Sequence, residues 1–488
     1  MYYIGIDLGT SAVKLLLMQE DGTVVKSVSR DYPLYFPKPA WSEQNPEDWW
    51  QATIYGLCEL TDGCDKSQIE GISFSGQMHG LVILDQADAV IRPAILWNDT
   101  RTDLETDWLN NEIGKDKLSQ YTANIAFAGF TAPKLLWLKK NEPDNFRKIA
   151  KIMLPKDFLV YRMTGVHATD VSDASGTLLF NVKAKSWSQE MLDLCEIKIS
   201  QMPQIFESFA PVAPLLPSVA QQLGFPGAVR IIAGAADNPA AAIGTGAVGN
   251  GVCNLSLGTS GTILIAGDRF AIDKHNALHA FANADGGYYL MGVILSAASC
   301  NKWWQNEIIG TRDYVGEEAK YAKLGENQVY FLPYLMGERS PHNDPHARGV
   351  FLGMDMSTTR ADMLGAMLEG VAFAFRDCCE IAKSSGMKIE RSRITGGGAR
   401  SGLWKNIMAN VLNIEIDVTA SEEGPALGAA ILAAVGCGAF ASVRAATEQI
   451  IKVAYTIKPD PAVAELYNQR YAKFAKIYPA VKEIFSIN

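Results

Sequence analysis

The hexapeptide Ile6-Asp7-Leu8-Gly9-Thr10-Ser11 ends one apolar run and precedes another. Residues 2–6 are typical of a buried strand, and residues 13–18 are typical of a second strand. A tight turn between the two strands would make a hairpin, with the polar part of the hexapeptide at its end. The stretch therefore predicts an α/β domain that presents polar groups at a strand edge.

The chemistry of this stretch suits a phosphate and a metal ion. Gly9 lets the backbone come close to a ligand, and Thr10 and Ser11 offer N–H and O–H donors to phosphoryl oxygens. Asp7 is a carboxylate, the ligand type that Mg²⁺ prefers. Gly9, Thr10 and Ser11 are thus candidate nucleotide-phosphate contacts, and Asp7 is the candidate metal ligand.

The motif returns 249 residues later, as Leu255-Ser256-Leu257-Gly258-Thr259-Ser260. Two further pieces repeat in the same order: residues 72–76 resemble 393–397, and residues 232–242 resemble 418–428. A conserved order of repeated pieces indicates duplication. We therefore expect two similar domains with a nucleotide between facing phosphate loops. Since the second copy has Ser256 where the first has Asp7, only one side needs a metal-binding carboxylate.

The unequal offsets between the repeats predict where insertions lie. The N-terminal domain would span residues 1–245, with an insertion at about 80–215, and would contain the candidate metal ligand Asp7. The C-terminal domain would span residues 246–488, with the nucleotide site and a helical cap. Gly244 to Gly251 contains four glycines and is the best linker candidate.

Composition fits a soluble globular protein. Of the 488 residues, 48% are hydrophobic and 20% charged, and the net charge is −9. No cluster of Lys and Arg argues for nucleic-acid binding. Eight scattered cysteines suit a reducing cytosol, and the apolar stretch at 425–440 is too short for a membrane helix, so we expect a buried helix there. Because a strand begins at residue 2, we expect no signal peptide, and we expect a cytoplasmic location.

Local signals predict two further groups of site residues in the first half. Ser75-Gly76-Gln77-Met78-His79-Gly80 follows a predicted strand, and strand ends are a usual place for ligand contacts in α/β proteins. Met78 and His79 are therefore candidate sugar contacts, with a structural histidine in a turn as the alternative. Residues 170–176 are polar and predict a loop over a site.

Asp237 and Asn238 follow an apolar strand and precede a helix of small residues. A carboxylate at this turn can accept a proton from a substrate, and the neighbouring amide can bind hydroxyls. The alternative is that Asp237 caps the helix.

In the second half, Gly396, Gly397 and Gly398 separate a predicted strand from a helix, with Ser401 close behind. Glycines in this position allow a flat adenosine group to lie against the backbone. These four residues are the candidate adenosine site.

Together the motifs resemble the FGGY carbohydrate kinases over nearly the whole chain. Gly129 to Asn141, with Lys134 and Trp137, resembles one signature of that family. Gly349 to Met354, followed by Asp362 to Glu369, resembles the other. The implied fold is α/β, two duplicated ribonuclease-H-like domains of the actin type with an active-site cleft between them.

The resemblance implies phosphorylation of D-xylulose to D-xylulose 5-phosphate with ATP and Mg²⁺. Asp237 would be the general base and Asp7 would help to hold Mg²⁺. Met78, His79, Asp237 and Asn238 would line the sugar. Gly258, Thr259 and Ser260 would hold phosphates together with the first loop, and Gly396 to Ser401 would hold the adenosine. There is no Gly-x4-Gly-Lys-Ser/Thr motif, so the chain is not a P-loop kinase.

Several alternatives stay open at this point. The substrate could be another pentulose, a polyol or a sugar acid, such as ribulose, 1-deoxy-D-xylulose, xylitol or gluconate. A non-catalytic actin-like assembly protein is the alternative from another class. Asp99 and Asp157 are the next candidates for the base. We expect a small sugar and ATP as partners, without nucleic acid or membrane, and a homodimer as one option for the assembly.

Overall fold

The computed structural model describes residues 1–226, 228–421 and 423–485. The chain forms two compact units, each built from three segments. The first unit contains residues 1–248, 280–288 and 423–451, and the second contains residues 249–279, 289–422 and 452–488. The chain thus passes between the units several times, whereas the sequence predicts one division after residue 245. Glu422, in the second copy of one repeat, lies outside the described residues.

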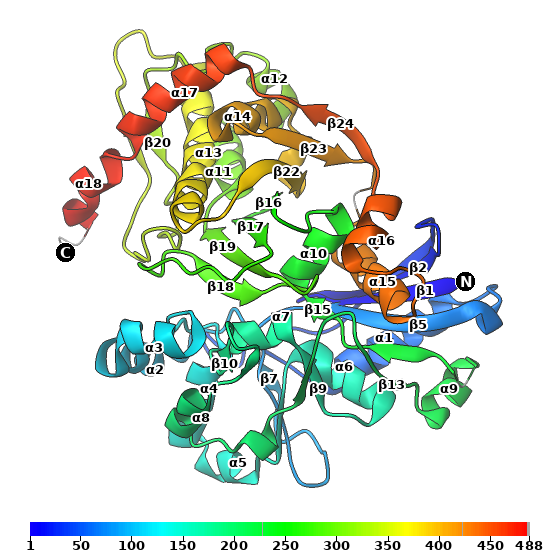
Figure 1. Cartoon of the computed structure of the whole chain (residues 1–488). Helices are drawn as coiled ribbons and strands as arrows, with labels where there is room; N and C mark the ends of the chain where they lie inside the picture. Colours follow the sequence, from blue (N-terminus) through cyan, green and yellow to red (C-terminus); the bar gives the residue numbers. More distant parts are fainter. Residues whose placement is uncertain (227, 422, 486–488) are drawn as a thin grey trace. The chain divides into compact units, whose positions relative to one another are not determined.

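A seven-stranded mixed sheet forms the centre of the first unit (Figure 1). Its order is β13-β14-β5-β1-β2-β3, and β15 pairs with the far end of β5. β1 is antiparallel to β2, as the predicted hairpin requires, and it is parallel to β5. The strands are β1 (Tyr2–Leu8), β2 (Ala12–Gln19), β3 (Val24–Asp31), β5 (Ile69–Gly76), β13 (Pro211–Pro214), β14 (Arg230–Ile232) and β15 (Ala235–Ala236).

A second seven-stranded sheet, of order β18-β19-β17-β16-β22-β23-β24, repeats this arrangement. β16 is antiparallel to β17 and parallel to β22, as β1 is to β2 and β5. The duplication predicted from the repeats is therefore confirmed, and so is the α/β fold that the family resemblance implies. The strands are β16 (Gly251–Leu257), β17 (Gly261–Gly267), β18 (His279–Ala282), β19 (Tyr288–Ile294), β22 (Ile389–Thr395), β23 (Glu415–Thr419) and β24 (Val453–Ile457).

Helices of small residues cover the first sheet. The predicted buried helix is α15 (Pro425–Gly436), which packs on β1, β5 and α10 (Asp237–Thr245). A Cβ at Gly5 would lie 1.9 Å from the Ala426 carbonyl oxygen, and one at Gly428 would lie 1.9 Å from that of Ala240. Such backbone contact needs residues without side chains. It explains why α15 belongs to the first unit despite its place late in the sequence.

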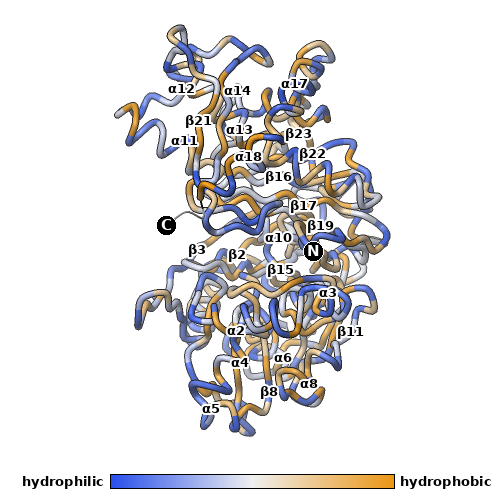
Figure 2. The backbone as a smooth tube through the Cα atoms, turned by 90° about the vertical axis from the view of Figure 1, so that its left-hand side faces the viewer, coloured by the Kyte–Doolittle hydropathy of each residue, from blue (hydrophilic) through white to orange (hydrophobic). Residues whose placement is uncertain are grey.

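The long connection between β5 and β14 carries the helices α2 to α9. Figure 2 shows one of its helices, α5, as mostly hydrophilic, and none of the α5 residues is buried. The main helices of the first unit are α1 (Pro46–Leu60), α2 (Asp103–Trp108), α3 (Lys115–Thr122), α4 (Thr131–Asn141), α5 (Pro143–Lys148), α6 (Pro155–Thr164), α7 (Val171–Ala174), α8 (Gln189–Cys195), α9 (Pro217–Leu223) and α16 (Val443–Ile450).

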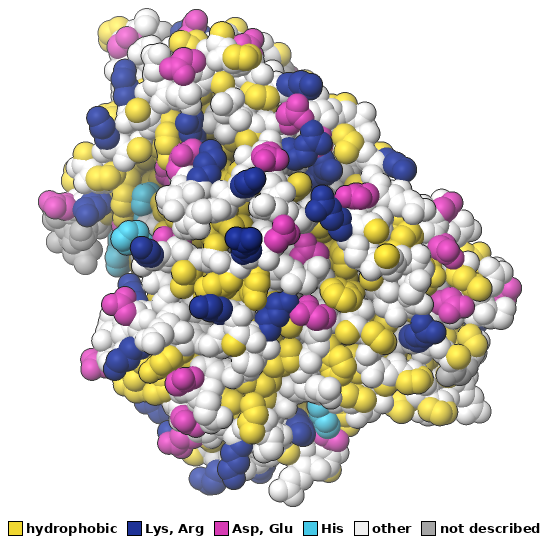
Figure 3. Space-filling view, in the orientation of Figure 1, with side chains coloured by type: hydrophobic (Ala, Val, Ile, Leu, Met, Phe, Trp, Pro, Cys, Tyr) yellow, Lys and Arg dark blue, Asp and Glu magenta, His cyan; other side chains and the backbone are white. Residues whose placement is uncertain are grey.

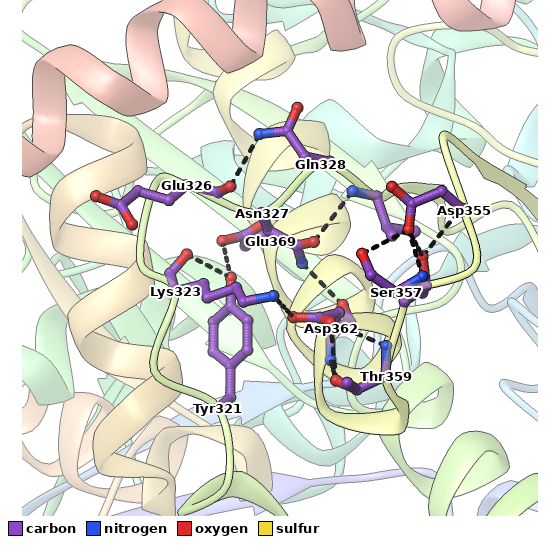
Figure 4. A network of polar contacts seen from close by, with 12 residues as sticks. Tyr321, Lys323, Glu326, Asn327, Gln328, Asp355, Ser357, Thr359, Asp362 and Glu369 are labelled. Carbon is purple, nitrogen blue, oxygen red and sulfur yellow. Dashed lines mark hydrogen bonds and ion pairs between the residues drawn. The ribbon is translucent and has the colours of Figure 1, made fainter.

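The second stretch that resembles a family signature has a structural task. Thr359 and Asp362 cap the long helix α13 reciprocally, and Lys323 pairs with Asp362 at 2.9 Å (Figure 4). Deeper in α13, the buried Glu369 accepts hydrogen bonds from Tyr321 at 2.6 Å and from Arg470 at 2.7 Å. The helices of this unit include α11 (Ala298–Trp303), α12 (Tyr314–Glu318), α13 (Arg360–Ser384), α14 (Gly402–Leu412), α17 (Pro461–Phe474) and α18 (Ile477–Phe485).

The surface carries both signs of charge. On the face drawn in Figure 3, basic and acidic side chains are interspersed and neither sign forms a continuous stripe. Among the described residues, no helix is long and apolar enough to cross a membrane.

Candidate functional site

Asp7 lies on β1, between neighbours that the register of the sheet fixes. It is opposite Lys14 on β2 and opposite Ser75 on β5. Burial raises the pKa of Asp7 to about 6, while the Ser75 hydroxyl and the Lys14 ammonium act in the lowering direction. Within the described residues, Oδ1 of Asp7 is buried without a hydrogen-bond partner. A buried carboxylate oxygen of this kind suits a cation.

Side chains from elsewhere in the first unit hold the turn after Asp7 in place. The Gly9 carbonyl accepts from the Tyr32 hydroxyl and, at 3.4 Å, from Gln77 Nε2. Thr10 accepts from Trp97 Nε1 at 3.0 Å through its hydroxyl. Ser11 is exposed at the tip of this turn. The loop predicted from Gly9 to Ser11 is thus a turn that neighbouring side chains hold in place and that leaves hydrogen-bond donors accessible.

Asp237 occupies the first position of α10, and it does not cap the helix. The N-cap residue is Ala236, and no side chain makes a cap hydrogen bond there. Instead, Oδ1 of Asp237 accepts from the Asn238 backbone N–H at 2.7 Å and from its side-chain Nδ2 at 2.9 Å. The capping alternative is therefore wrong, and both of these hydrogen bonds to the carboxylate come from Asn238.

The electrostatics of Asp237 link it to Asp7. Burial raises the pKa of Asp237 to about 7, and the negative charge of Asp7 acts in the same direction. The two hydrogen bonds from Asn238 oppose this rise. The two carboxylates are thus near enough to influence each other, as residues of one site would be.

Met78 lies next to Asn238, the residue that holds Asp237. Asn238 Nδ2 is 4.0 Å from the Met78 sulfur, so β5 and α10 bring these two side chains together. His79 has a φ of +69°, an unusual backbone conformation for a side chain of this size. The buried Lys134 ammonium stabilises the turn by donating to the His79 carbonyl oxygen at 2.8 Å. Burial lowers the pKa of Lys134 to about 7.

The polar stretch at 170–176 differs from the prediction. It is not a loop over a site but a fully buried segment made of the end of β9 (Ala168–Asp170), α7 and the start of the 3₁₀ turn η3 (Ser175–Thr177). Several of its polar side chains hydrogen-bond within the segment, for example Ser172 Oγ to Asp170 Oδ2 at 2.5 Å, and the buried Asp173 lies 3.7 Å from the Lys156 ammonium. Polarity alone therefore misled the sequence interpretation.

The second unit brings the other predicted residues together. The turn from Gly258 to Ser260 follows β16, and Thr259 and Ser260 are exposed. A Cβ at Gly396 would lie 3.0 Å from the Gly258 amide nitrogen. The glycine loop (Gly396 to Gly398) and the turn from Gly258 to Ser260 are therefore in contact. Gly397 is exposed with open space beside it, and Gly398 is buried against Leu257 and Trp404.

Ser401 has two roles at the end of the glycine loop. Its hydroxyl oxygen accepts from Trp404 N–H at 3.0 Å, which caps α14, and it donates to Glu318 Oε2 at 2.6 Å. Asn301 Nδ2 also donates to Glu318, at 3.4 Å. Glu318 and Asn301 carry no motif that sequence reasoning could have used, because α11 and α12 lie far from the loop in the chain.

The two other candidate bases are engaged elsewhere. Asp99 is fully buried and pairs with Arg101, with Nη2 to Oδ2 at 2.6 Å. Asp157 is fully buried and pairs with Lys156 at 2.7 Å. Lys14, which the sequence analysis does not name, is opposite Asp7 and pairs with Glu423 at 2.5 Å. Lys14 faces Asp7 because of the register between β1 and β2, and this register follows from the length of the turn that joins the two strands.

Comparisons with known proteins match this arrangement. Residues 2–244 match the N-terminal domain of the FGGY family of carbohydrate kinases, and residues 253–437 match its C-terminal domain. The chain is 39% identical to the xylulose kinase of Bacillus subtilis (strain 168), covering 99% of this chain and 98% of that protein.

Two solved structures are similar over almost the whole chain. A xylulose kinase from Rhodospirillum rubrum has a TM-score of 0.94 at 28% identity and covers 100% of both chains. A gluconate kinase from Lactobacillus acidophilus has a TM-score of 0.93 at 29% identity and covers 98% of both chains. With both domains matched in order, the chain belongs to the FGGY family of carbohydrate kinases.

Proposed function

We propose that this chain transfers the γ-phosphoryl group of ATP to D-xylulose and forms D-xylulose 5-phosphate. The observation that carries the proposal is the Asp237 carboxylate, whose pKa is raised and which accepts two hydrogen bonds from Asn238, a residue whose side chain contacts Met78. The 39% identity to a xylulose kinase over 99% of the chain supports the choice of sugar.

Asp237 is proposed as the general base. A pKa of about 7 leaves a carboxylate that is ionised in a large share of molecules at neutral pH and is still basic enough to accept a proton. Because Asn238 donates to Oδ1, we assign proton acceptance to Oδ2. The sugar hydroxyl would lose its proton to Oδ2 as its oxygen attacks phosphorus, with no covalent enzyme intermediate.

Met78, His79 and Asn238 are proposed to hold the sugar. His79 Nδ1 lies 2.6 Å from the Gly176 carbonyl oxygen, which can only accept, so Nδ1 carries a hydrogen. In the neutral ring, Nε2 is then the acceptor for a sugar hydroxyl. The Asn238 amide can donate and accept without competing with Asp237 as a base.

The proposed nucleotide contacts are divided between the units. Gly9 to Ser11 and Gly258 to Ser260 would hold the phosphates, and Gly396 to Gly398 with Ser401 would hold the adenosine. Asp7 would hold Mg²⁺, and its buried Oδ1 fits a cation. When bound, the ion would neutralise charge on the phosphoryl oxygens. One carboxylate is enough, since Mg²⁺ usually completes its shell with waters and substrate phosphates.

A second candidate substrate is a sugar acid, because one of the similar solved structures is a gluconate kinase. The charge of the site argues against a sugar acid. A substrate carboxylate beside Asp237 would meet a site in which Asp7 already disfavours further negative charge. A neutral pentulose avoids this repulsion, so we place D-xylulose first.

A substrate panel tests the proposal. Purified protein with ATP and Mg²⁺ is given D-xylulose, D-ribulose, 1-deoxy-D-xylulose, xylitol or D-gluconate, and ADP formation and the sugar phosphate are measured. We expect the highest kcat/KM with D-xylulose. A higher value with D-gluconate would overturn the sugar assignment. ATP turnover that no sugar raises would instead support the non-catalytic, actin-like alternative.

Location and assembly belong to the same proposal. We propose a cytoplasmic enzyme, because it would use ATP and because its eight cysteines are all free thiols. A homodimer is proposed as well, and light scattering of the purified protein at several concentrations would test it.

A further inference from the structure

A buried segment contacts the chain next to the proposed base, Asp237, and the ring of the proposed sugar contact, His79. Residues 170–177 run through α7 and η3 in the first unit, and all eight are buried. Apart from the Gly176 carbonyl, which accepts from His79 Nδ1, the proposed mechanism gives this segment no role. Its two ends nevertheless contact the backbone before Asp237 and the ring of His79.

The first contact is made through Ser172. The Ala236 backbone N–H, directly before Asp237, donates to Ser172 Oγ at 3.1 Å. Ser172 Oγ in turn donates to Asp170 Oδ2 at 2.5 Å, and Ser208 Oγ donates to the same oxygen at 2.6 Å. Since Ala235 and Ala236 pair with Ser75 and Gly76 of β5, the strand before Asp237 is held on both sides.

The second contact is made through Gly176. Its carbonyl oxygen lies 2.6 Å from His79 Nδ1 and sets the direction of the ring. A Cβ at position 176 would lie 2.6 Å from His79 Nδ1 and 3.1 Å from the Met78 methyl carbon. Glycine is therefore needed for His79 to sit where it does.

Buried charge anchors the segment. Lys156 Nζ is 2.9 Å from Asp170 Oδ1, 2.7 Å from Asp157 Oδ1 and 3.7 Å from Asp173 Oδ2, and all four side chains are fully buried. Burial alone would lower the pKa of Lys156, but the three carboxyl groups outweigh burial and raise it, so the ammonium stays charged. Buried ion pairs of this kind tolerate little displacement.

We propose that residues 170–177 form a positioning segment, which orients the Asp237 carboxylate through Ser172 and the His79 imidazole through Gly176. The inference rests on the roles proposed above for Asp237 and His79. It goes beyond them because it assigns a task in the reaction to residues that do not touch the substrate. Misplacing a base by about 1 Å can cost roughly 100-fold in rate, so a positioning residue can matter as much as a contact.

The test compares Ser172→Ala with Ser188→Ala. Ser188 is a matched control because it is also buried, lies in the same unit and accepts from a backbone N–H, that of Met191 at 3.4 Å. We expect Ser172→Ala to lower kcat roughly 10- to 100-fold, with little change in the KM for D-xylulose or ATP. Ser188→Ala should keep kcat within about threefold, and melting temperatures of both variants would show any common loss of stability.

Gly176→Ala tests the second contact. Displacing the His79 ring should raise the KM for D-xylulose about tenfold, with a smaller loss of kcat. If Ser172 and Gly176 had a purely structural role, Ser172→Ala, Gly176→Ala and Ser188→Ala would have similar kinetics at similar melting temperatures. That result would overturn the proposal.

A double variant separates this inference from the assignment of the base. If Ser172 acts through Asp237, Ser172→Ala should have almost no further effect on kcat in an Asp237→Asn background. A full further loss in that background would overturn positioning through Asp237. If Asp237→Asn alone keeps its turnover, the base assignment fails, whatever Ser172→Ala does.

Discussion

Asn238 donates two hydrogen bonds to the same oxygen of Asp237, from its backbone nitrogen at 2.7 Å and from its side-chain amide at 2.9 Å. The carboxylate is thereby fixed in direction without being neutralised by a cation. It retains a pKa near 7, while the carboxylates of Asp99 and Asp157 lie against basic side chains. This difference supports the proposal of Asp237, rather than Asp99 or Asp157, as the base.

Asp237→Asn should lower turnover about 10²- to 10⁴-fold, the usual worth of general-base catalysis. The amide keeps the shape of the side chain but loses the basic oxygen. ATP affinity, measured by calorimetry, should change little because the proposed adenosine contacts lie in the second unit. His79→Ala should instead raise the KM for the sugar. More than a tenth of wild-type turnover in Asp237→Asn would contradict the assignment.

The pH profile should follow the same group. Because the base must be ionised, kcat/KM should fall as the pH drops through about 7. Asn238→Ala removes the side-chain hydrogen bond that lowers this pKa, so the acid limb should move to higher pH. A limb that stays in place in Asn238→Ala would show that another group controls it.

Stability should respond to Asp237 in the opposite sense to activity. A pKa raised from 3.8 to about 7 means that ionising this group costs stability, a penalty that is absent below pH 4 and complete above pH 7. Asp237→Asn should therefore be more stable than wild type at pH 8, by roughly 1–3 kcal/mol, and not at pH 4. Thermal unfolding at both pH values checks this, with the exposed Asp144→Asn as a control that should show no such pH dependence.

Asp7→Asn should weaken the dependence on Mg²⁺ as well as the rate. A neutral amide is a poor ligand for a hard cation, so the Mg²⁺ concentration for half-maximal rate should rise. Titrating Mg²⁺ at saturating sugar and ATP measures this. A titration curve and rate equal to those of wild type would remove Asp7 from the metal site.

The sequence was sufficient to predict the sheets because the same polar motif follows an apolar strand twice. The turns at Gly9 and Gly258 could be recognised from local chemistry alone. The segment at 170–177 could not, because its polarity is satisfied by Lys156 and Ser208, which only the folded chain brings near. Likewise, the sequence placed α15 in the second half, because no local pattern shows that Gly428 packs against the backbone of Ala240.

The last prediction concerns Lys134, on the stretch that resembles the first family signature. Its ammonium donates to the carbonyl oxygens of His79 at 2.8 Å and Gly129 at 2.7 Å and thus fixes the turn that presents His79. Lys134→Met fills much of the same space but removes one donor from each carbonyl. The His79 carbonyl keeps the Thr131 hydroxyl at 3.1 Å, whereas the Gly129 carbonyl loses its partner among the described residues, at a cost of about 1–3 kcal/mol. Because His79 already has a φ of +69°, we expect this turn to relax first.

The kinetic signature should be a rise in the KM for D-xylulose of roughly tenfold, with a smaller loss of kcat, since Asp237 keeps its own support from Asn238. Lys139→Met is the matched control, because Lys139 lies on the same helix but its side chain is 40% exposed. It should leave the KM unchanged and cost little stability. If both variants gave the same KM for the sugar, Lys134 would serve only the stability of α4, and the link from the signature to His79 would be wrong.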